Sequence, residues 1–487
     1  MLRPVATTDD RRSLVSLATA VGALALFAAG ALTPLSLRAV APLLVVALAV
    51  TLRAGRLLAW KNQIALLVLV ILFVPIRRYV MPGQLPFQLE PYRLLCALVL
   101  GAWASSLLID RRVRLRGTAL DGPLFAFTFA ALASVIANSG RVTTLGLQSE
   151  VVKRLTFFAS FFAVVYLIRS LIRSDDHIDF IVKTLVAGGS VLAFFAVLEA
   201  RTDYNVFNHL SSVLPGFRLG DLPYSLGTAR GSRLRVYASA EHPIALGAAL
   251  AMLLPLALYL AVRFRQRRWY AAAVLVGVGS LTTISRTTII MLVVLAVVMS
   301  RVRKLRLRRF WPLLVPLLIA VHLALPGTIG SFKETFFPKG GLVAEQKQGA
   351  GTYGSGRIAD LGPGLHEFSQ HPFLGEGFGT RVTEKGPKQN APILDDQWLG
   401  LLLETGILGA LAMLWLFSRS IRRLLREAKQ DASPRGLLLG GLAASVAAYA
   451  VSMVTYDALA FVQVTFLLFI LLGLGAALLP HKPRAAH

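Results

Sequence analysis

Cysteine is almost absent from this chain, and charged residues are scarce. Cys96 is the one cysteine among 487 residues, so disulfides cannot hold the fold and a thiolate metal cluster cannot form. Charged residues make up 16% of the chain against 55% hydrophobic residues, a composition that excludes an ordinary soluble domain. The sequence also has no phosphate-binding loop, no dinucleotide fingerprint and no cluster with metal-ligand spacing. Coupling to cytosolic nucleotide hydrolysis is therefore not expected.

Long apolar runs occupy most of the remaining sequence. A run of about 20 residues can cross a bilayer as one helix. Such runs lie at residues 13–30, 39–52, 62–76, 94–109, 122–138, 155–170, 178–200, 243–262, 269–283, 286–300, 310–325, 397–418, 436–455 and 459–479. The first run imitates a signal peptide, but the many spans after it favour a retained helix. The sequence therefore predicts an all-α polytopic membrane protein with about 12–14 transmembrane helices.

Basic residues lie in short clusters between these runs. The net charge of +26 would indicate nucleic acid in a soluble protein. Here the clusters, such as those at 301–309 and 419–429, alternate with the spans as the positive-inside rule requires. The alternation predicts cytoplasmic termini and two outward-facing loops, one medium and one large. The larger loop has nearly balanced charge, so no nucleic-acid partner is expected.

The two loops divide the chain into segments. These are N-terminal transmembrane helices (1–200), the medium outer loop (201–242), further helices (243–325), the large outer loop (326–396) and C-terminal helices (397–487). Within the large loop, residues 356–370 form the best candidate for a helix. The sequence shows no internal repeat, so it gives no support to the inverted symmetry that many secondary transporters have.

Arginines cluster at two places on the predicted outer side. Arg286 lies in a group of hydroxyl residues at the junction of two apolar runs, and Arg233 and Arg235 precede the span at 243–262. A charge near a span is usually paired or functional, and a guanidinium meets phosphate oxygens bidentately. These arginines are candidate ligands for a diphosphate at the membrane surface. A snorkelling helix-end arginine at position 286 and solvated loop residues at 233 and 235 are the alternatives.

Three carboxylates mark the end of the large loop and the helix after it. Asp395 and Asp396 are adjacent where the span at 397–418 begins, and Glu404 lies within that span. Adjacent carboxylates raise the pKa of at least one of them, and an acid there could accept a proton from a hydroxyl nucleophile. Ordinary helix capping explains an Asp at this position equally well. Glu404 requires a partner such as an arginine, in a structural ion pair or in catalysis.

Three blocks of sequence resemble a known family. They are Arg233 to Gly247, Ser285-Arg286-Thr287, and Gly356-Arg357 through His371–Gly379 to Glu404-Thr405-Gly406. In this order they resemble the bacterial O-antigen ligase and O-antigen polymerase superfamily. The resemblance implies diphosphate binding by Arg286 and by Arg233 or Arg235, and it adds Arg357. The family's ligases commonly carry His-Asn where this chain has Asp395-Asp396.

The resemblance implies a membrane glycosyltransferase of the bacterial inner membrane with its active site in the periplasm. It would take a glycan from undecaprenyl diphosphate and pass it to the hydroxyl of an acceptor glycan or a lipid-linked acceptor. We expect an inverting reaction without metal or cofactor. Asp395, next to Asp396, would deprotonate the acceptor, and Glu404 would hold an arginine. The bilayer and a chain-length regulator are the further expected partners.

The missing family histidine favours a polymerase of surface polysaccharide repeat units over a ligase to lipid A core. A flippase of lipid-linked glycans is the alternative from another class. It would line a groove through the spans with arginines, whereas this chain concentrates its polar motifs on one predicted side. A non-catalytic membrane scaffold is a third possibility, although it would not require Arg286 in a hydroxyl cluster.

Overall fold

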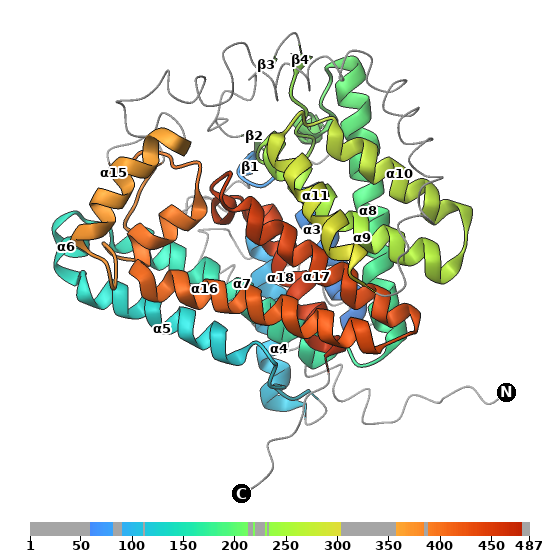
Figure 1. Ribbon diagram of the computed structural model, residues 1–487, viewed down its shortest axis with the longest axis horizontal. Helices are drawn as coiled ribbons and strands as arrows, with labels where there is room; N and C mark the ends of the chain where they lie inside the picture. The colour runs from blue at the N-terminus through green and yellow to red at the C-terminus, as the bar shows by residue number, and fades with distance from the viewer. Residues whose placement is uncertain are drawn as a thin grey trace, which may run out of the picture.

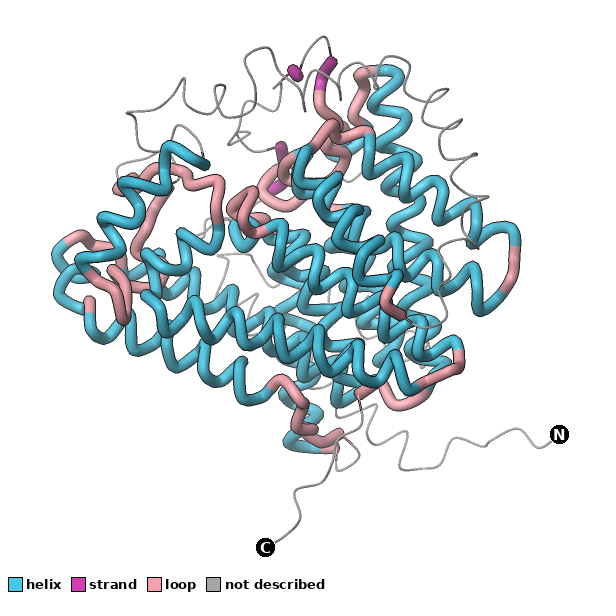
Figure 2. Tube along the Cα trace, viewed as in Figure 1, coloured by secondary structure: helices cyan, strands magenta, loops and turns pink. Residues whose placement is uncertain are grey.

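The computed structural model describes residues 59–80, 90–110, 113–212, 218–219, 229–230, 233–302, 357–383 and 388–479. The predicted spans at 13–30, 39–52 and 310–325 lie outside these residues, as does the first part of the large loop. The described chain is a bundle of helices joined mostly by short loops (Figures 1 and 2).

Each predicted span that falls on described residues is a helix. The helices are α3 (Trp60–Phe73), α4 (Pro91–Ile109), α5 (Asp121–Ala137), α6 (Ser139–Thr144), α7 (Gln148–Leu171), α8 (Asp175–Thr202), α9 (Pro243–Phe264), α10 (Arg267–Leu281), α11 (Arg286–Ser300), α15 (Arg357–Gln370), α16 (Gln397–Gln430), α17 (Pro434–Ser452) and α18 (Val462–Leu478). The helix predicted at 356–370 in the large loop is confirmed as α15.

The remaining regular structure in the described chain is confined to loops. Strand β1 (Tyr79–Val80) pairs antiparallel with β2 (Arg218–Leu219), and β3 (Ala229–Arg230) pairs with β4 (Arg233–Leu234). Single 3-10 turns occur at Val206–Asn208, Leu210–Ser212 and Ala458–Ala460. These pieces leave the fold class all-α.

Among the described residues, 6 helices are long and apolar enough to cross a membrane, namely α4, α7, α8, α9, α16 and α17. Helices α3, α5, α11 and α18 are apolar but shorter. The predicted class, an all-α polytopic membrane protein, is confirmed. The total number of spans stays a prediction because three of the ranges lie outside the described chain.

Helix α9 forms the centre of the bundle. Its apolar window is 89% buried, against 33% for α4, so α9 is interior and α4 peripheral. Helices α8, α10, α11, α17 and α18 all pack against α9. Both α9 and α17 are rich in Ala and Gly, which lets helix backbones approach closely where water provides no driving force. Ser445 of α17 also donates to the Met252 carbonyl of α9 at 2.7 Å.

The helix starts follow capping rules. The Ser174 side chain accepts from the His177 amide at the start of α8, and the Ser433 side chain accepts from the Arg435 amide at the start of α17. At α9, His242 Nδ1 accepts from the Ile244 amide at 3.2 Å, and Pro243 takes the first helical position. Local sequence thus determines where these helices begin.

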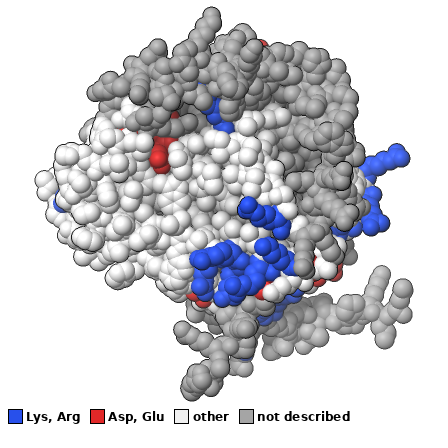
Figure 3. All heavy atoms as spheres, viewed as in Figure 1, with Lys and Arg blue, Asp and Glu red and all other residues white. Residues whose placement is uncertain are grey.

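The far end of α16 is basic. Its last turns carry Arg419, Arg422, Arg423, Arg426 and Lys429. Figure 3 shows Lys and Arg side chains gathered over this part of α16, next to a broad uncharged surface. A basic helix end beside an uncharged surface is the pattern expected at one membrane interface.

Candidate functional site

Helix α16 is broken at Gly406, and a segment of the large loop docks into the break. Gly406 has φ 64° and ψ −166°, which interrupts the helical hydrogen bonds. The segment 371–379 replaces them: the Glu376 amide donates to the Leu403 carbonyl at 2.8 Å, and the Gly377 amide donates to the Glu404 carbonyl at 3.2 Å. Irregular backbone at membrane depth is tolerated where protein satisfies it in this way.

Glycine is required on both sides of the joint, the contact between the docked segment 371–379 and the break in α16. Gly375 has φ 65°, and a Cβ there would lie 2.5 Å from the Leu403 carbonyl oxygen. A Cβ on Gly406 would lie 2.2 Å from the Phe373 carbonyl carbon. The glycines of the family-like block therefore allow two backbones to meet and carry no chemistry of their own.

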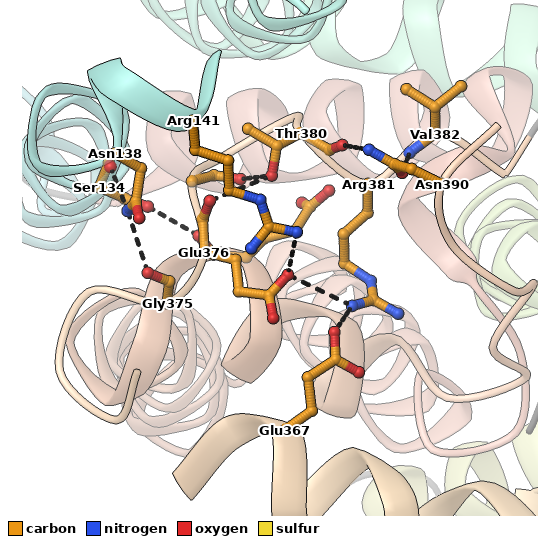
Figure 4. A network of polar contacts seen from close by, with 12 residues as sticks. Ser134, Asn138, Arg141, Glu367, Gly375, Glu376, Thr380, Arg381, Val382 and Asn390 are labelled. Carbon is orange, nitrogen blue, oxygen red and sulfur yellow. Dashed lines mark hydrogen bonds and ion pairs between the residues drawn. The ribbon is translucent and has the colours of Figure 1, made fainter. Parts of the chain in front are cut away.

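Helix α5 and the residue after it hold the same joint from outside. Ser134 donates to the Glu404 carbonyl at 2.7 Å, and Asn138 Nδ2 donates to the Gly375 carbonyl at 3.0 Å. Figure 4 shows Asn138 directed at Gly375 of the docked segment, with Ser134 beside it. The N-terminal helices and the large loop are thus fixed to one another at this point.

A charge network extends from the joint towards α15 (Figure 4). Arg141 of α6 pairs with Glu376 at 2.7 Å, and Arg381 pairs with Glu367 of α15 and lies 3.9 Å from Glu376. Burial raises the pKa of Glu376, the nearby Glu367 raises it further, and Arg141 opposes both. This network orients Arg381, whose side chain lines the cavity described next.

Beside the joint lies a cavity of about 250 Å³. Its wall is formed by α7, by the starts of α9, α16 and α18, by the residues that follow the docked segment and by the loop between α17 and α18. Its charged lining residues are Arg77, Glu150, Lys153, Arg154, Arg381, Asp395, Asp396, Glu404 and Asp457. The aromatic ones are Phe157, Phe158, Phe161, His242, Phe378, Tyr456 and Phe461. Opposite charges and aromatic rings thus surround one space.

The three predicted carboxylates all line this cavity but differ in what they do. Asp396 caps α16, since its Oδ1 accepts from the Trp398 amide at 2.8 Å and the Leu399 amide at 3.2 Å. Asp395 is exposed at the cavity. Glu404 is buried, with 7% of its surface exposed. The capping interpretation therefore accounts for Asp396, and Asp395 is left as the accessible carboxylate of the adjacent pair.

A further carboxylate stands near Asp395. Asp457 lies on the loop between α17 and α18, and this loop is tied to the start of α16: the Gln397 amide donates to the Met453 carbonyl at 2.8 Å, and Gln397 Oε1 accepts from the Leu459 amide at 2.7 Å. Burial raises the pKa of Asp457 and Asp395 raises it further, whereas Arg154 and Arg77 lower it. The charge of Asp395 thus acts on a residue distant in sequence.

Arg77 reaches the cavity from the segment after α3. Its Nε lies 3.4 Å from Glu241, and its amide donates to Glu90 Oε2 at 2.7 Å. Burial raises the pKa of Glu241 to about 7, although Arg77 opposes the shift. Arg77 is therefore held in place by two acids from other parts of the chain.

Two of the predicted arginines, Arg286 and Arg235, are not among the described residues that line the cavity. Arg286 is the first residue of α11 and is half-buried. Arg235 is buried, and its Nε donates to the Thr283 carbonyl at 3.4 Å, so it lies against the turn that leads to Arg286. Arg233 begins β4 and Arg357 begins α15, but their side chains are outside the described part. Diphosphate binding by these four residues stays a prediction.

Sequence reasoning missed all four Lys and Arg residues of the cavity, namely Arg77, Lys153, Arg154 and Arg381. It also missed Asp457. A signal existed for Lys153 and Arg154, because they precede a predicted span on the side where basic residues are otherwise sparse. Among the described residues, no group of three His, Cys, Asp or Glu side chains could hold a metal ion.

Fold and cavity together define a polytopic α-helical membrane protein in which a large loop, docked on a broken helix, borders a charged cavity. Residues 271–414 match the family model described as O-antigen ligase. This match supports the resemblance to the O-antigen ligase and polymerase superfamily, whose members transfer glycans. The matched region contains Arg286, the docked segment, Asp395 and Glu404. No curated protein matches the sequence.

Loss of the Asp396 cap should lower the stability of the folded protein. Asp396→Ala leaves the Trp398 and Leu399 amides without their acceptor, and we expect a loss of about 1 kcal/mol in the free energy of unfolding. Asp396→Ser, which keeps a capping oxygen, should restore most of it. Thermal unfolding of the two purified variants in detergent checks this. Equal midpoints for the two would contradict the capping role.

Proposed function

We propose that this protein transfers a glycan from undecaprenyl diphosphate to an acceptor hydroxyl at the outer face of the inner membrane. The observation that carries the proposal is the cavity, which combines cations with an exposed carboxylate at the starts of α9, α16 and α18. Helix N-termini favour anions, and a diphosphate is the anion that the family resemblance implies. The aromatic residues of α7 offer an apolar wall next to the cations.

The chemistry follows from where charge develops. The acceptor oxygen attacks the anomeric carbon of the donor sugar, and the bond from that carbon to the phosphate oxygen breaks with its electron pair staying on the diphosphate. Cations compensate this growing charge; Arg77 and Lys153 in the cavity, with Arg286 and Arg235 beyond it, are the candidates. Asp395 accepts the proton from the acceptor hydroxyl. Attack from the side opposite the leaving group inverts the anomeric centre, and no metal is required.

Repeat-unit polymerisation is the form of the reaction that we favour. Asp395 stands where the family's ligases commonly have histidine, and this substitution separates the chain from them. Ligation to lipid A core is the second candidate because the matching family model is described as O-antigen ligase. We also propose cytoplasmic termini, on the basis of the alternating basic clusters, and a chain-length regulator as a partner of the polymerase.

The test uses the full-length protein in lipid nanodiscs with a repeat unit linked to undecaprenyl diphosphate. Lengthening of the lipid-linked glycan is the expected result. Transfer only to added lipid A core would replace the polymerase by a ligase, and no transfer to either acceptor would overturn the proposed reaction. Movement of the donor between leaflets of proteoliposomes would then support a flippase. An unchanged rate in the presence of a chelator is expected, and its loss would contradict the metal-independent mechanism.

A further inference from the structure

Arg154 lies where three distant parts of the chain meet. It is half-buried in the second turn of α7, outside the region that matches the family model. Its side chain lines the cavity together with Glu404 of α16 and Asp457 of the loop between α17 and α18. The face of α7 that contributes to the cavity carries Glu150, Lys153, Arg154, Phe157, Phe158 and Phe161.

The charge of Arg154 acts on both of these carboxylates. For Glu404 it is the strongest favourable charge, ahead of Arg381. For Asp457 it is again the strongest, ahead of Arg77. Arg381 interacts favourably with Glu404 and Arg77 with Asp457, whereas Arg154 interacts favourably with both carboxylates. A cation shared by two carboxylates in a confined space interacts favourably with the negative charge of each and limits their mutual repulsion.

The docked segment fixes Arg154 from the other side. Gly379 has φ 79°, and a Cβ on it would lie 2.9 Å from the Cβ of Arg154. The backbone of Gly379 therefore packs directly on the stem of the arginine. The Gly379 amide also donates a hydrogen bond to the Glu404 carboxylate. One residue of the segment thus contacts both the cation and one of its acids, so the docking of the segment and the placement of Arg154 depend on each other.

We propose that Arg154 is the positioning residue of the cavity, which holds Glu404 and Asp457 as a pair of carboxylates beside Asp395. The role of Arg154 in turnover rests on the proposed glycan transfer. Its electrostatic interaction with Glu404 and Asp457 does not. Arg154 acts on Asp457, and the charges of Asp457 and Asp395 act on each other. Arg154 therefore influences the electrostatic environment of Asp395, the carboxylate that takes the acceptor's proton. The N-terminal helices then supply a part of the active site that the matched domain lacks.

The pH dependence of transfer gives the specific readout. The charged and titratable groups around Asp457 in the cavity are Arg154, Arg77, His242, Asp395, Glu404 and Tyr456. Arg154 lowers the pKa of Asp457, so its removal raises that pKa, and Asp457 becomes protonated at a higher pH. Because the proposed pair requires Asp457 to be ionised during transfer, the acid limb of the rate profile should move to higher pH in Arg154→Gln. Arg154→Lys keeps the charge and should move the limb back towards that of the native protein.

The activity test compares Arg154→Gln and Arg154→Lys with Arg173→Gln in the nanodisc assay. Arg173 is an exposed arginine just beyond the end of the same helix. We expect a fall of about 100-fold in kcat for Arg154→Gln with a shifted acid limb, partial rescue by lysine, and native behaviour in the control. A native acid limb in Arg154→Gln would overturn the proposal. If the native protein shows no transfer, the proposed function fails by itself.

A stability cycle tests the charge balance without any turnover. Arg154→Gln and Glu404→Gln should each lower the thermal midpoint, since each leaves a buried partner uncompensated. The double variant should lie closer to the native midpoint than the sum of the two shifts predicts. Additive shifts would show that Arg154 and Glu404 do not interact and would overturn the proposal even if transfer is confirmed.

Discussion

Replacement of Asp395 by asparagine is expected to lower the rate of glycan transfer about 10²- to 10⁴-fold, the range typical for loss of a general base. Asp395 is the accessible carboxylate of the adjacent pair that lines the cavity, whereas Asp396 is engaged in the cap of α16. Asparagine keeps the shape and the polarity but cannot take the proton. Binding of the donor should change little, so the effect should fall on kcat. Steady-state transfer at several donor concentrations measures this.

Asp203→Asn is the matched control for this experiment. Asp203 is an exposed residue at the end of α8 with φ 54°, a left-handed conformation that asparagine also tolerates. It lies outside the cavity lining. This variant should transfer glycan at the native rate. If Asp395→Asn also does so, another group takes the proton, and Asp457 would be the next residue to replace.

Gly406→Ala is expected to destabilise the folded protein by roughly 3 kcal/mol or more. The backbone at Gly406, with φ 64° and ψ −166°, lies in a region that is essentially open only to glycine. The added methyl group would also collide with the carbonyl carbon of Phe373. The collision is relieved most simply if the docked segment moves away from α16. The carbonyls of Leu403 and Glu404 would then lack their hydrogen-bond donors. The thermal midpoint and the yield of folded protein in detergent measure the effect.

Gly140→Ala provides the control for the glycine prediction. Gly140 lies inside α6, and a Cβ there would meet nothing within 4 Å. Alanine favours a helix interior over glycine by roughly 1 kcal/mol, so this variant should be as stable as the native protein or slightly more so. Native stability of Gly406→Ala would show that α16 can run through position 406 as a continuous helix. The docked segment would then not depend on the break.

Much of the fold could be predicted from the sequence because bilayer thickness determines the length of an apolar run. The run at 178–200 became α8 with ends two to three residues away, the run at 155–170 became α7, which begins seven residues earlier, and the helix predicted at 356–370 became α15. The break inside α16 was not predicted. An isolated glycine in an apolar run does not reveal that another backbone segment replaces the missing helical hydrogen bonds.

The candidate site was predicted only in part. Asp395 and Glu404 could be found because charges at the edge of an apolar run or inside it are costly and therefore informative. The separate roles of Asp395 and Asp396 could not, since spacing alone does not distinguish a helix cap from an accessible carboxylate. Hydrogen bonds from two backbone amides assign the cap to Asp396.

The sequence by itself determined the all-α polytopic membrane class, through run length and basic clusters, and three blocks of residues indicated the resemblance to the O-antigen ligase and polymerase superfamily. Only the tertiary structure decided which charges share a cavity. Arg154, Glu404 and Asp457 come from separate helices and loops, and their contacts depend on how α7, α16 and the docked segment pack. Helix packing is a long-range property, because each helix can turn a different face to its neighbours without any change in its own hydrogen bonds.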